Sequence, residues 1–179
     1  MNTLTFRAAT TADIPALIAL VTSAYRGEAS RAGWTTEADL LDGARIDAAG
    51  LQAELGRPRS TILLAEREGR LLACAHVADD NGTGYFGMFS VAPGQQGGGI
   101  GKQVMAAAEA HAARAWGLSK MQMAVIDVRD ELIAFYERRG YRRTGIKKPF
   151  PYGDARFGIP KRDDLRFELL EKPLSGTAA

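Results

Sequence analysis

The segment 94–103 (GQQGGGIGKQ) concentrates glycine at the point where a strand-like run gives way to a helical pattern. Four of the five residues 97–101 are glycine, and an alanine-rich stretch follows them. Because glycine has no Cβ, successive backbone N–H groups can point at one anion, and a helix that begins there adds its dipole and its unpaired amides. The segment therefore predicts binding of a phosphate-bearing ligand. The alternative is a turn that serves chain geometry alone.

The spacing of these glycines does not fit two common phosphate-binding loops. A Walker A loop needs glycine where the chain has Gln96, and serine or threonine where it has Gln103. A dinucleotide-binding G-x-G-x-x-G pattern fits Gly97 and Gly99 but fails at Lys102. The expected ligand therefore carries phosphate but is not a nucleoside triphosphate with magnesium.

The elements that must position this segment form a mixed set of strands and helices. Alternating or continuous apolar runs predict strands, and apolar residues at helical spacing predict helices. The predicted strands cover 3–10, 61–68, 70–79, 85–93, 120–127, 141–148 and 165–174, and the predicted helices cover 11–27, parts of 28–60, 99–116 and 129–139. This order predicts one α+β domain over residues 1–174, followed by a frayed tail at 175–179.

Composition limits the class of protein. The 179 residues suit one domain, and a net charge of +2 is too balanced to predict a nucleic-acid surface. No apolar run approaches a membrane span, no signal peptide is evident, and the single cysteine, Cys74, fits a reducing compartment. We therefore expect a cytoplasmic protein without membrane or nucleic-acid partners. His76 and His111 lack metal-ligand spacing, so no metal is expected.

Two segments resemble motifs of the GNAT superfamily of N-acetyltransferases. Residues 91–105 (VAPGQQGGGIGKQVM) are similar to the acetyl-CoA-binding pattern Q/R-x-x-G-x-G/A, matched by Gln96, Gly99 and Gly101. Residues 131–145 (ELIAFYERRGYRRTG) resemble the family's xxFYxxxGF joint between a helix and a strand. The resemblance implies a central, mostly antiparallel twisted sheet of six to seven strands with about four helices. It also implies that the sheet splays between its fourth and fifth strands, often with help from a β-bulge.

The resemblance implies acetyl-CoA as co-substrate and assigns the residues that bind it. In the family, the coenzyme A pyrophosphate lies on the amides of the glycine-rich loop, and the pantetheine arm follows the backbone of the preceding strand. The amide near Phe89 would polarise the thioester carbonyl. The six basic residues of 137–148 are expected to form a solvated strand edge or to face the coenzyme A phosphates, and a nucleic-acid patch is the alternative. The implied cofactor-binding residues are Phe89, Val91, Gln96, Gly97, Gly98, Gly99, Ile100, Gly101 and Lys102.

By the same resemblance, Tyr136 is the expected general acid. A phenol with a pKa of about 10 stays protonated at neutral pH and can donate to a departing thiolate, whose conjugate thiol has a pKa of about 8.5. The alternative is core packing, because Leu132, Phe135 and Tyr136 form one apolar stripe. Many family members carry asparagine seven residues earlier, where this chain has Arg129. The cofactor contacts of that asparagine are therefore not carried over.

The general base stays open among four carboxylates. An ammonium substrate must lose a proton before it attacks, and a carboxylate that acts through water is a usual solution. The candidates are Glu37, Asp79, Asp80 and Asp127. Asp127 closes a strand beside the expected splay and is therefore favoured, whereas Asp79 and Asp80 precede an Asn-Gly turn.

The acceptor site is expected in residues 25–45 (YRGEASRAGWTTEADLLDGAR), where aromatic side chains, carboxylates and arginines alternate. An aromatic floor beside a carboxylate suits a cationic amine, and the arginines would equally bind a substrate carboxylate. A plain helix start capped by Thr35 or Thr36 is the structural alternative. The expected substrate-binding residues are Tyr25, Arg26, Trp34 and Glu37.

The resemblance implies an enzyme that transfers an acetyl group from acetyl-CoA to a primary amine of a small molecule or peptide. The amine would attack directly in a ternary complex. The alternative is a non-catalytic acyl-CoA-binding module that uses the same cleft for sensing. A homodimer is an open alternative to a monomer.

Overall fold

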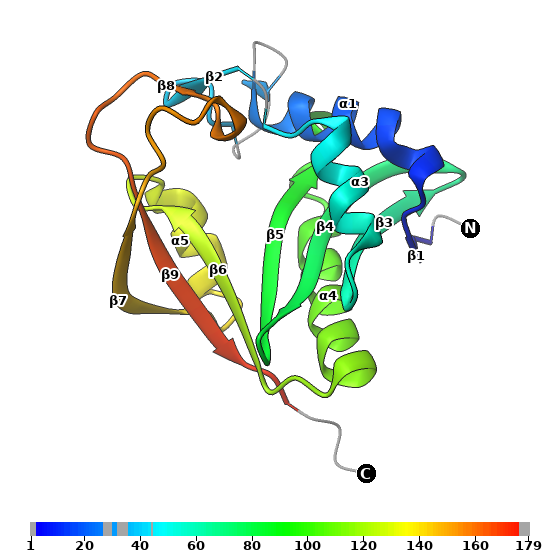
Figure 1. Cartoon of the computed structure of the whole chain (residues 1–179). Helices are drawn as coiled ribbons and strands as arrows, with labels where there is room; N and C mark the ends of the chain where they lie inside the picture. Colours follow the sequence, from blue (N-terminus) through cyan, green and yellow to red (C-terminus); the bar gives the residue numbers. More distant parts are fainter. Residues whose placement is uncertain (1–2, 27–29, 32–35, 44, 176–179) are drawn as a thin grey trace.

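The computed structural model describes residues 3–26, 30–31, 36–43 and 45–175. Its main sheet has seven strands in the order β1-β3-β4-β5-β6-β9-β7, and β5 and β6 form its one parallel pair (Figure 1). The strands are β1 (Thr5–Ala8), β3 (Ser60–Arg67), β4 (Arg70–Asp80), β5 (Thr83–Val91), β6 (Lys120–Ile126), β7 (Arg142–Pro149) and β9 (Arg166–Pro173). This confirms the α+β class with a mostly antiparallel sheet. Two-residue strands β2 (Leu41–Asp42) and β8 (Ile159–Pro160) form a second small sheet, which the sequence did not predict.

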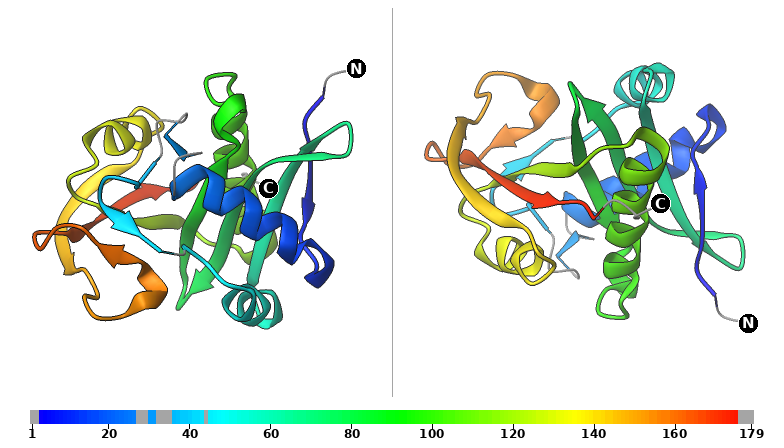
Figure 2. Two further views of the ribbon diagram at one scale, coloured as in Figure 1. Left: turned by 90° about the horizontal axis from the view of Figure 1, so that it is seen from above. Right: turned by 90° about the horizontal axis from the view of Figure 1, so that it is seen from below.

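Helices cover both faces of the sheet. Helices α1 (Ile14–Tyr25) and α3 (Ala48–Gly56) pack on one face, and α4 (Ile100–Trp116) and α5 (Asp130–Glu137) on the other (Figure 2). Strand β3 shows why, because side chains alternate between the faces of a strand. Ile62 and Leu64 join the core beneath α1 and α3, whereas Leu63 and Ala65 join the core beneath α4.

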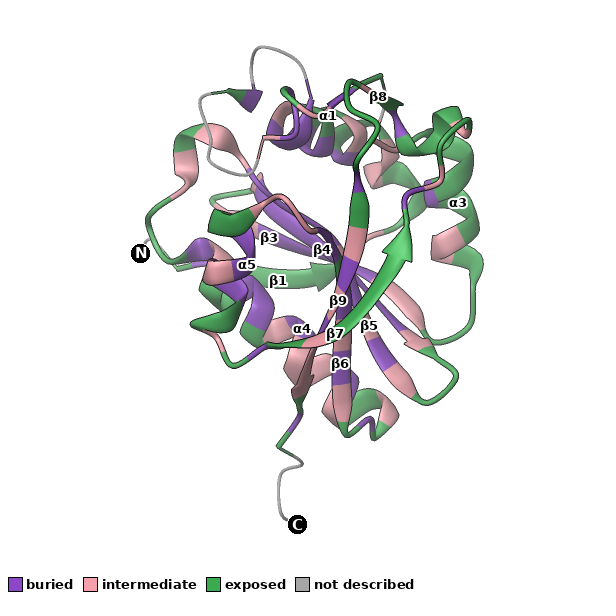
Figure 3. Cartoon of the chain, turned by 90° about the vertical axis from the view of Figure 1, so that its left-hand side faces the viewer, coloured by how far each residue is buried: buried purple, intermediate pink, exposed green. Residues whose placement is uncertain are grey.

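Burial follows the sheet order. The middle of β4 is buried, whereas β7 at the sheet edge is exposed along most of its length (Figure 3). The basic residues of β7 keep this edge solvated, as expected for an unpaired strand edge. Within the described residues, no helix combines the length and apolarity needed to cross a membrane. The tail residues 176–179 lie outside the described residues.

The sheet splays between its fourth and fifth strands, β5 and β6. These strands pair only at Gly84–Met121 and Tyr85–Gln122, and they diverge from that vertex (Figure 1). Gly84 permits the close approach, because a Cβ there would lie 2.9 Å from the sulfur of Met121. A bulge bends β5 farther along. The β4–β5 register shifts between Cys74 and His76, and Met88 has a φ of 51°.

Candidate active site

Two cavities flank the splay and share Phe89 of β5. The first, of about 260 Å³, lies among the end of α1, the strands β5 and β6, and the start of α5. The second, of about 600 Å³, lies between the end of β5, the glycine-rich segment and α5. A reaction between a ligand in one cavity and a ligand in the other would therefore take place beside Phe89.

The glycine-rich segment forms one wall of the second cavity. Gly97 and Gly99 have φ values of 90° and 80°, which other residues rarely adopt, and α4 begins at the next residue after Gly99. The side-chain amide of Gln96 donates to the carbonyl oxygen of Val91 at 3.1 Å and so ties the segment to β5. The start of α4 thus presents its amides to this cavity, as an anion site requires.

The expected cofactor-binding residues divide into two groups. Phe89, Val91, Gln96, Gly97, Gly99, Gly101 and Lys102 line the second cavity. Gly98 is exposed and does not line it, and the side chain of Ile100 is buried in the core beneath α4. Neither Gly98 nor Ile100 therefore lines the second cavity.

Gly101 leaves room for the ring of Phe89, the residue that the two cavities share. A Cβ at Gly101 would lie 2.9 Å from the ring of Phe89, so an alanine there would push Phe89 away. Phe89 stacks on Phe135 at a centroid distance of 6.1 Å, and the guanidinium of Arg139 lies 3.6 Å from the Phe135 ring centre. These contacts hold the floor of the second cavity.

The second cavity also carries a surplus of positive charge. Lys102, Arg138 and Arg139 line it, against the single carboxylate of Glu131. Arg138 and Arg139 belong to the basic run that the sequence placed either at a strand edge or beside phosphates. The rest of that run lies on β7. Exposed amides beside three cations are the donor set that a diphosphate needs.

Tyr136 of α5 lines the first cavity and is 4% exposed. Its ring packs on Phe86, Phe89 and Tyr141 at centroid distances of 6.5, 6.3 and 6.1 Å. Burial raises the pKa of Tyr136 well above its usual 10, because the phenolate would lose its hydration. Among the described residues, its hydroxyl has no hydrogen-bond partner. The ring of Tyr136 therefore packs in the core, and its hydroxyl stays protonated at the wall of the first cavity.

Tyr25, the last residue of α1, anchors the bulged strand. Its hydroxyl donates to the carbonyl oxygen of Phe89, and burial raises its pKa to about 12. The guanidinium groups of Arg45 and Arg129 lie over its ring at 5.5 and 5.8 Å. Tyr25 thus connects the first cavity to the residue shared by both.

Glu37 and Arg26 form a buried ion pair in the first cavity. Arg26 Nη1 lies 3.2 Å from Glu37 Oε1, and Arg129 Nη1 lies 3.8 Å from the same oxygen. The amide of Glu37 donates to the carbonyl oxygen of Tyr25, which holds its segment against the end of α1. Burial lowers the pKa of Arg26. Trp34, the fourth expected substrate-binding residue, lies outside the described residues.

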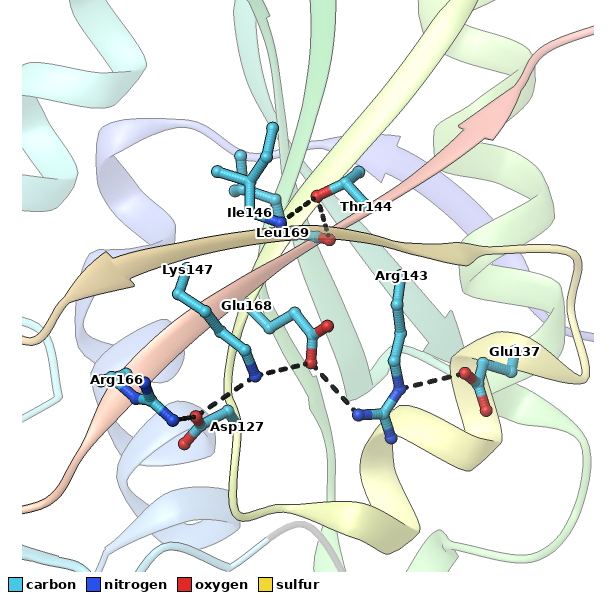
Figure 4. A network of polar contacts seen from close by, with 9 residues as sticks. All are labelled: Asp127, Glu137, Arg143, Thr144, Ile146, Lys147, Arg166, Glu168 and Leu169. Carbon is cyan, nitrogen blue, oxygen red and sulfur yellow. Dashed lines mark hydrogen bonds and ion pairs between the residues drawn. The ribbon is translucent and has the colours of Figure 1, made fainter.

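Asp127, the favoured base, does not line the first cavity. It lies at the end of β6 in an ion-pair network, where Lys147 and Arg166 approach its Oδ2 at 3.3 and 3.1 Å (Figure 4). Asp79 is likewise engaged elsewhere, with Arg59 at 2.6 Å. Of the four candidate carboxylates, only Glu37 lines the first cavity.

The network around Asp127 ties α5 to the two last strands of the sheet. Glu168 of β9 accepts from Lys147 and Arg143, each at 3.2 Å, and Arg143 also reaches Glu137 of α5 at 3.2 Å (Figure 4). Where the β7–β9 register shifts, Thr144 Oγ1 donates to the carbonyl oxygen of Leu169 at 2.9 Å. The ion pair between Arg143 and Glu137 thus connects β7 to the last residue of the helix that carries Tyr136.

Several lining residues of the first cavity escaped the sequence interpretation. Arg45 stood among the arginines of the acceptor segment but was not singled out, and Arg129 was noted only as a departure from the family pattern. The aromatic residues Phe150, Phe157 and Phe167 come from the C-terminal third of the chain. No local pattern predicts them, because Phe150 and Phe157 reach the site only through the segment 150–165 that connects β7 to β9, and Phe167 lies on β9 itself.

Comparisons with known proteins identify the family. The model of the acetyltransferase (GNAT) family matches residues 18–141. The structure resembles the ribosomal-protein-S18-alanine N-acetyltransferase from Escherichia coli, with a TM-score of 0.71, 14% identity, and 98% and 97% of the two chains covered. It also resembles the ribosomal-protein-alanine N-acetyltransferase from Brucella melitensis, with a TM-score of 0.69, 23% identity, and 95% and 99% covered.

A third similar structure contains the co-substrate. It is yncA, a putative acetyltransferase from Salmonella typhimurium with its cofactor acetyl-CoA, at a TM-score of 0.69, 19% identity, and 99% and 97% covered. A search of curated protein sequences finds no significant match. Acetyl-CoA is the co-substrate of the family, and the amides and cations of the second cavity fit its diphosphate. The chain belongs to the GNAT family of acetyltransferases.

Proposed function

We propose that the protein transfers the acetyl group of acetyl-CoA to a primary amine by direct attack in a ternary complex. The observation that carries the proposal is the pair of cavities joined at Phe89. One fits a diphosphate-bearing thioester, and the other is lined by a buried tyrosine and a carboxylate. Acetyl-CoA supplies an activated acyl group with a thiolate leaving group.

The residues of the first cavity take complementary roles. Tyr136 donates its phenolic proton to the departing sulfur, and its raised pKa keeps that proton in place at neutral pH. Glu37 orients the amine and accepts its proton, directly or through water, because it is the one candidate carboxylate at this cavity. We therefore assign the role of general base to Glu37 and not to Asp127.

Support for the cofactor side comes from the second cavity. The amides of residues 96–101 bind the diphosphate, with Lys102 beside them, and the backbone at Phe89 and Val91 binds the pantetheine arm. Because of the bulge at Met88, some backbone groups of β5 make no ladder hydrogen bonds with β4. These groups can bind the thioester carbonyl. The homodimer and the cytoplasmic location stay predictions.

Thiol release from acetyl-CoA, measured over a panel of amines, tests the proposal. We expect turnover in wild type and a fall in kcat of about 100-fold for Tyr136→Phe, with KM for acetyl-CoA unchanged. Tyr141→Phe is the matched control, since Tyr141 is buried but lines neither cavity. A protein that binds coenzyme A but turns over no amine would instead be the sensing module.

A further inference from the structure

The opening between β5 and β6 closes at its vertex. The two strands pair there, with Gly84 opposite Met121, and they diverge toward the glycine-rich segment (Figure 1). Their backbones approach so closely that a Cβ at Gly84 would lie 3.0 Å from the carbonyl oxygen of Lys120. An extended ligand that enters the opening from the glycine-rich segment therefore cannot pass beyond the vertex.

In the proposed complex, the acyl group is the part of the ligand nearest this vertex. The diphosphate lies at the glycine-rich segment, which follows the end of β5, and the pantetheine arm runs back along the strand from Val91 to Phe89. Beyond Phe89, the strand continues through Gly87 and Phe86 to Gly84 at the vertex. An acyl chain that extends past the thioester carbonyl therefore points toward Phe86.

Phe86 fills the space between Phe89 and the vertex. It is the first residue of β5 after those that pair with β6, it is 2% exposed, and it lines the first cavity. Its ring packs on the rings of Phe89 and Tyr136 at centroid distances of 5.5 and 6.5 Å, and those two rings lie 6.3 Å apart. Because the three rings pack on one another, additional carbon atoms between them would force them apart.

The surroundings of Phe86 are packed core. Val77, which lies opposite Phe86 in the β4–β5 ladder, and Met121 of β6 are both fully buried in the same hydrophobic cluster. Met123 of β6 belongs to this cluster and lines the first cavity as well. Adding a methylene to a well-packed core requires shifts of side chains and backbone that cost free energy. The ring of Phe86 is therefore not free to move aside for a longer acyl group.

On this basis we infer that Phe86 limits the length of the acyl group, so that the protein binds acetyl thioesters in preference to longer ones. The inference rests on the proposed acetyl transfer and names the class of acyl donor for that site. Phe86 is a specificity-determining residue in this account, because its side chain meets the end of the acyl chain and takes no part in the chemistry.

Binding of acyl-CoA thioesters, measured by calorimetry without any amine, tests the inference. The probes are acetyl-CoA, propionyl-CoA and butyryl-CoA, and coenzyme A is the reference for the contacts of the diphosphate and the pantetheine arm. For wild type we expect butyryl-CoA to bind about tenfold more weakly than acetyl-CoA, with propionyl-CoA between them. Equal dissociation constants for acetyl-CoA and butyryl-CoA would mean that the acyl chain does not meet Phe86, and would overturn the inference.

Truncating Phe86 should remove this preference. In Phe86→Leu, and more fully in Phe86→Ala, we expect butyryl-CoA to bind about as tightly as acetyl-CoA, while the Kd for coenzyme A stays that of wild type. A gain in butyryl-CoA binding cannot result from loss of the fold, and the wild-type comparison tests the inference even if a variant fails to fold.

Tyr141→Leu is the matched control for the loss of a buried ring. Tyr141 is 1% exposed and packs on Tyr136 at 6.1 Å, but it lines neither cavity. This variant should keep the wild-type ratio of the butyryl-CoA and acetyl-CoA dissociation constants. A wild-type ratio in both folded Phe86 variants, or a ratio that falls equally in Tyr141→Leu, would refute the role of Phe86.

The two levels of the account fail differently. If the thioesters bind as expected but no amine releases thiol, acetyl transfer to an amine is wrong and the limit on acyl length stands. If amines are acetylated but acetyl-CoA and butyryl-CoA bind equally, acetyl transfer stands and the role of Phe86 is wrong.

Discussion

The hydroxyl of Tyr25 donates a hydrogen bond to the carbonyl oxygen of Phe89, across 64 residues of chain. The contact joins the C-terminal end of α1 to the strand that bulges at Met88. Because Phe89 lines both cavities, this hydrogen bond connects α1 to the backbone that lies between them. In our proposal, the contact therefore joins the segment that binds the acceptor to the strand that binds the cofactor.

Removing this hydrogen bond should affect both stability and cofactor binding. In Tyr25→Phe the buried carbonyl of Phe89 loses its donor, so we expect a loss of about 1 kcal/mol in the free energy of unfolding, seen as a lower urea midpoint. KM for acetyl-CoA should rise, because the β5 backbone is less fixed. A variant with the urea midpoint and KM of wild type would show that this contact does not hold the strand.

The left-handed glycine before α4 should be required for cofactor binding. Gly99→Ala costs about 1–2 kcal/mol of backbone strain, and we expect KM for acetyl-CoA to rise about tenfold. Gly117, which ends the same helix with a φ of 66°, is the matched control. Gly117→Ala should lower stability comparably without changing KM. Equal effects of both variants on KM would contradict a specific role for the glycine-rich segment.

The pH dependence of kcat should show no sign that the Tyr136 hydroxyl loses its proton at neutral or moderately alkaline pH. The donor must be protonated, and burial raises its pKa well above 10, so the active form persists through neutral and alkaline pH. We expect no decline of kcat from phenol ionisation up to pH 10 in stopped thiol-release assays. An alkaline decline below pH 10 that disappears in Tyr136→Phe would contradict this environment.

Acid should weaken the junction between β1 and α1. Hydrogen bonds from Arg7 and from the Thr10 amide lower the pKa of Asp13 to about 2. In the unfolded state this carboxyl has its ordinary pKa of 3.8, so between pH 4 and pH 2 the unfolded state binds more protons than the folded state. The stabilisation from Asp13 is therefore present above pH 4 and is lost as the pH falls toward 2.

The matching variant is Asp13→Asn. Because the Arg7 side chain is 44% exposed, water screens the pair, and we expect the variant to be less stable by about 1 kcal/mol at pH 7. The difference should shrink toward pH 2, as measured by urea unfolding at each pH. A difference that is the same at both pH values would exclude the carboxylate as its source.

The sequence predicted the elements that carry periodic or motif signals. The strands, the long helix after the glycine-rich segment and the stripe containing Tyr136 are local patterns, and the structure has them within a few residues of the predicted bounds. The two-residue strands β2 and β8 gave no such signal, because pairing of so short a segment depends on the loops that bring it together.

Side-chain partners across long sequence separations were not predictable. Asp127 was favoured because it closes β6, but its environment is set by Lys147 and Arg166 on the last two strands. The approach of Arg129 to Glu37 spans 92 residues and depends on how α5 faces α1 across the splay. Such contacts follow from packing, not from spacing along the chain.

The most direct test of the account is a crystal structure of the protein with coenzyme A. We predict the diphosphate on the amides of residues 96–101, the pantetheine arm along β5 beside Phe89, and the sulfur within hydrogen-bond reach of the Tyr136 hydroxyl. A complex in which coenzyme A avoids the glycine-rich segment, or in which the sulfur lies away from Tyr136, would contradict it.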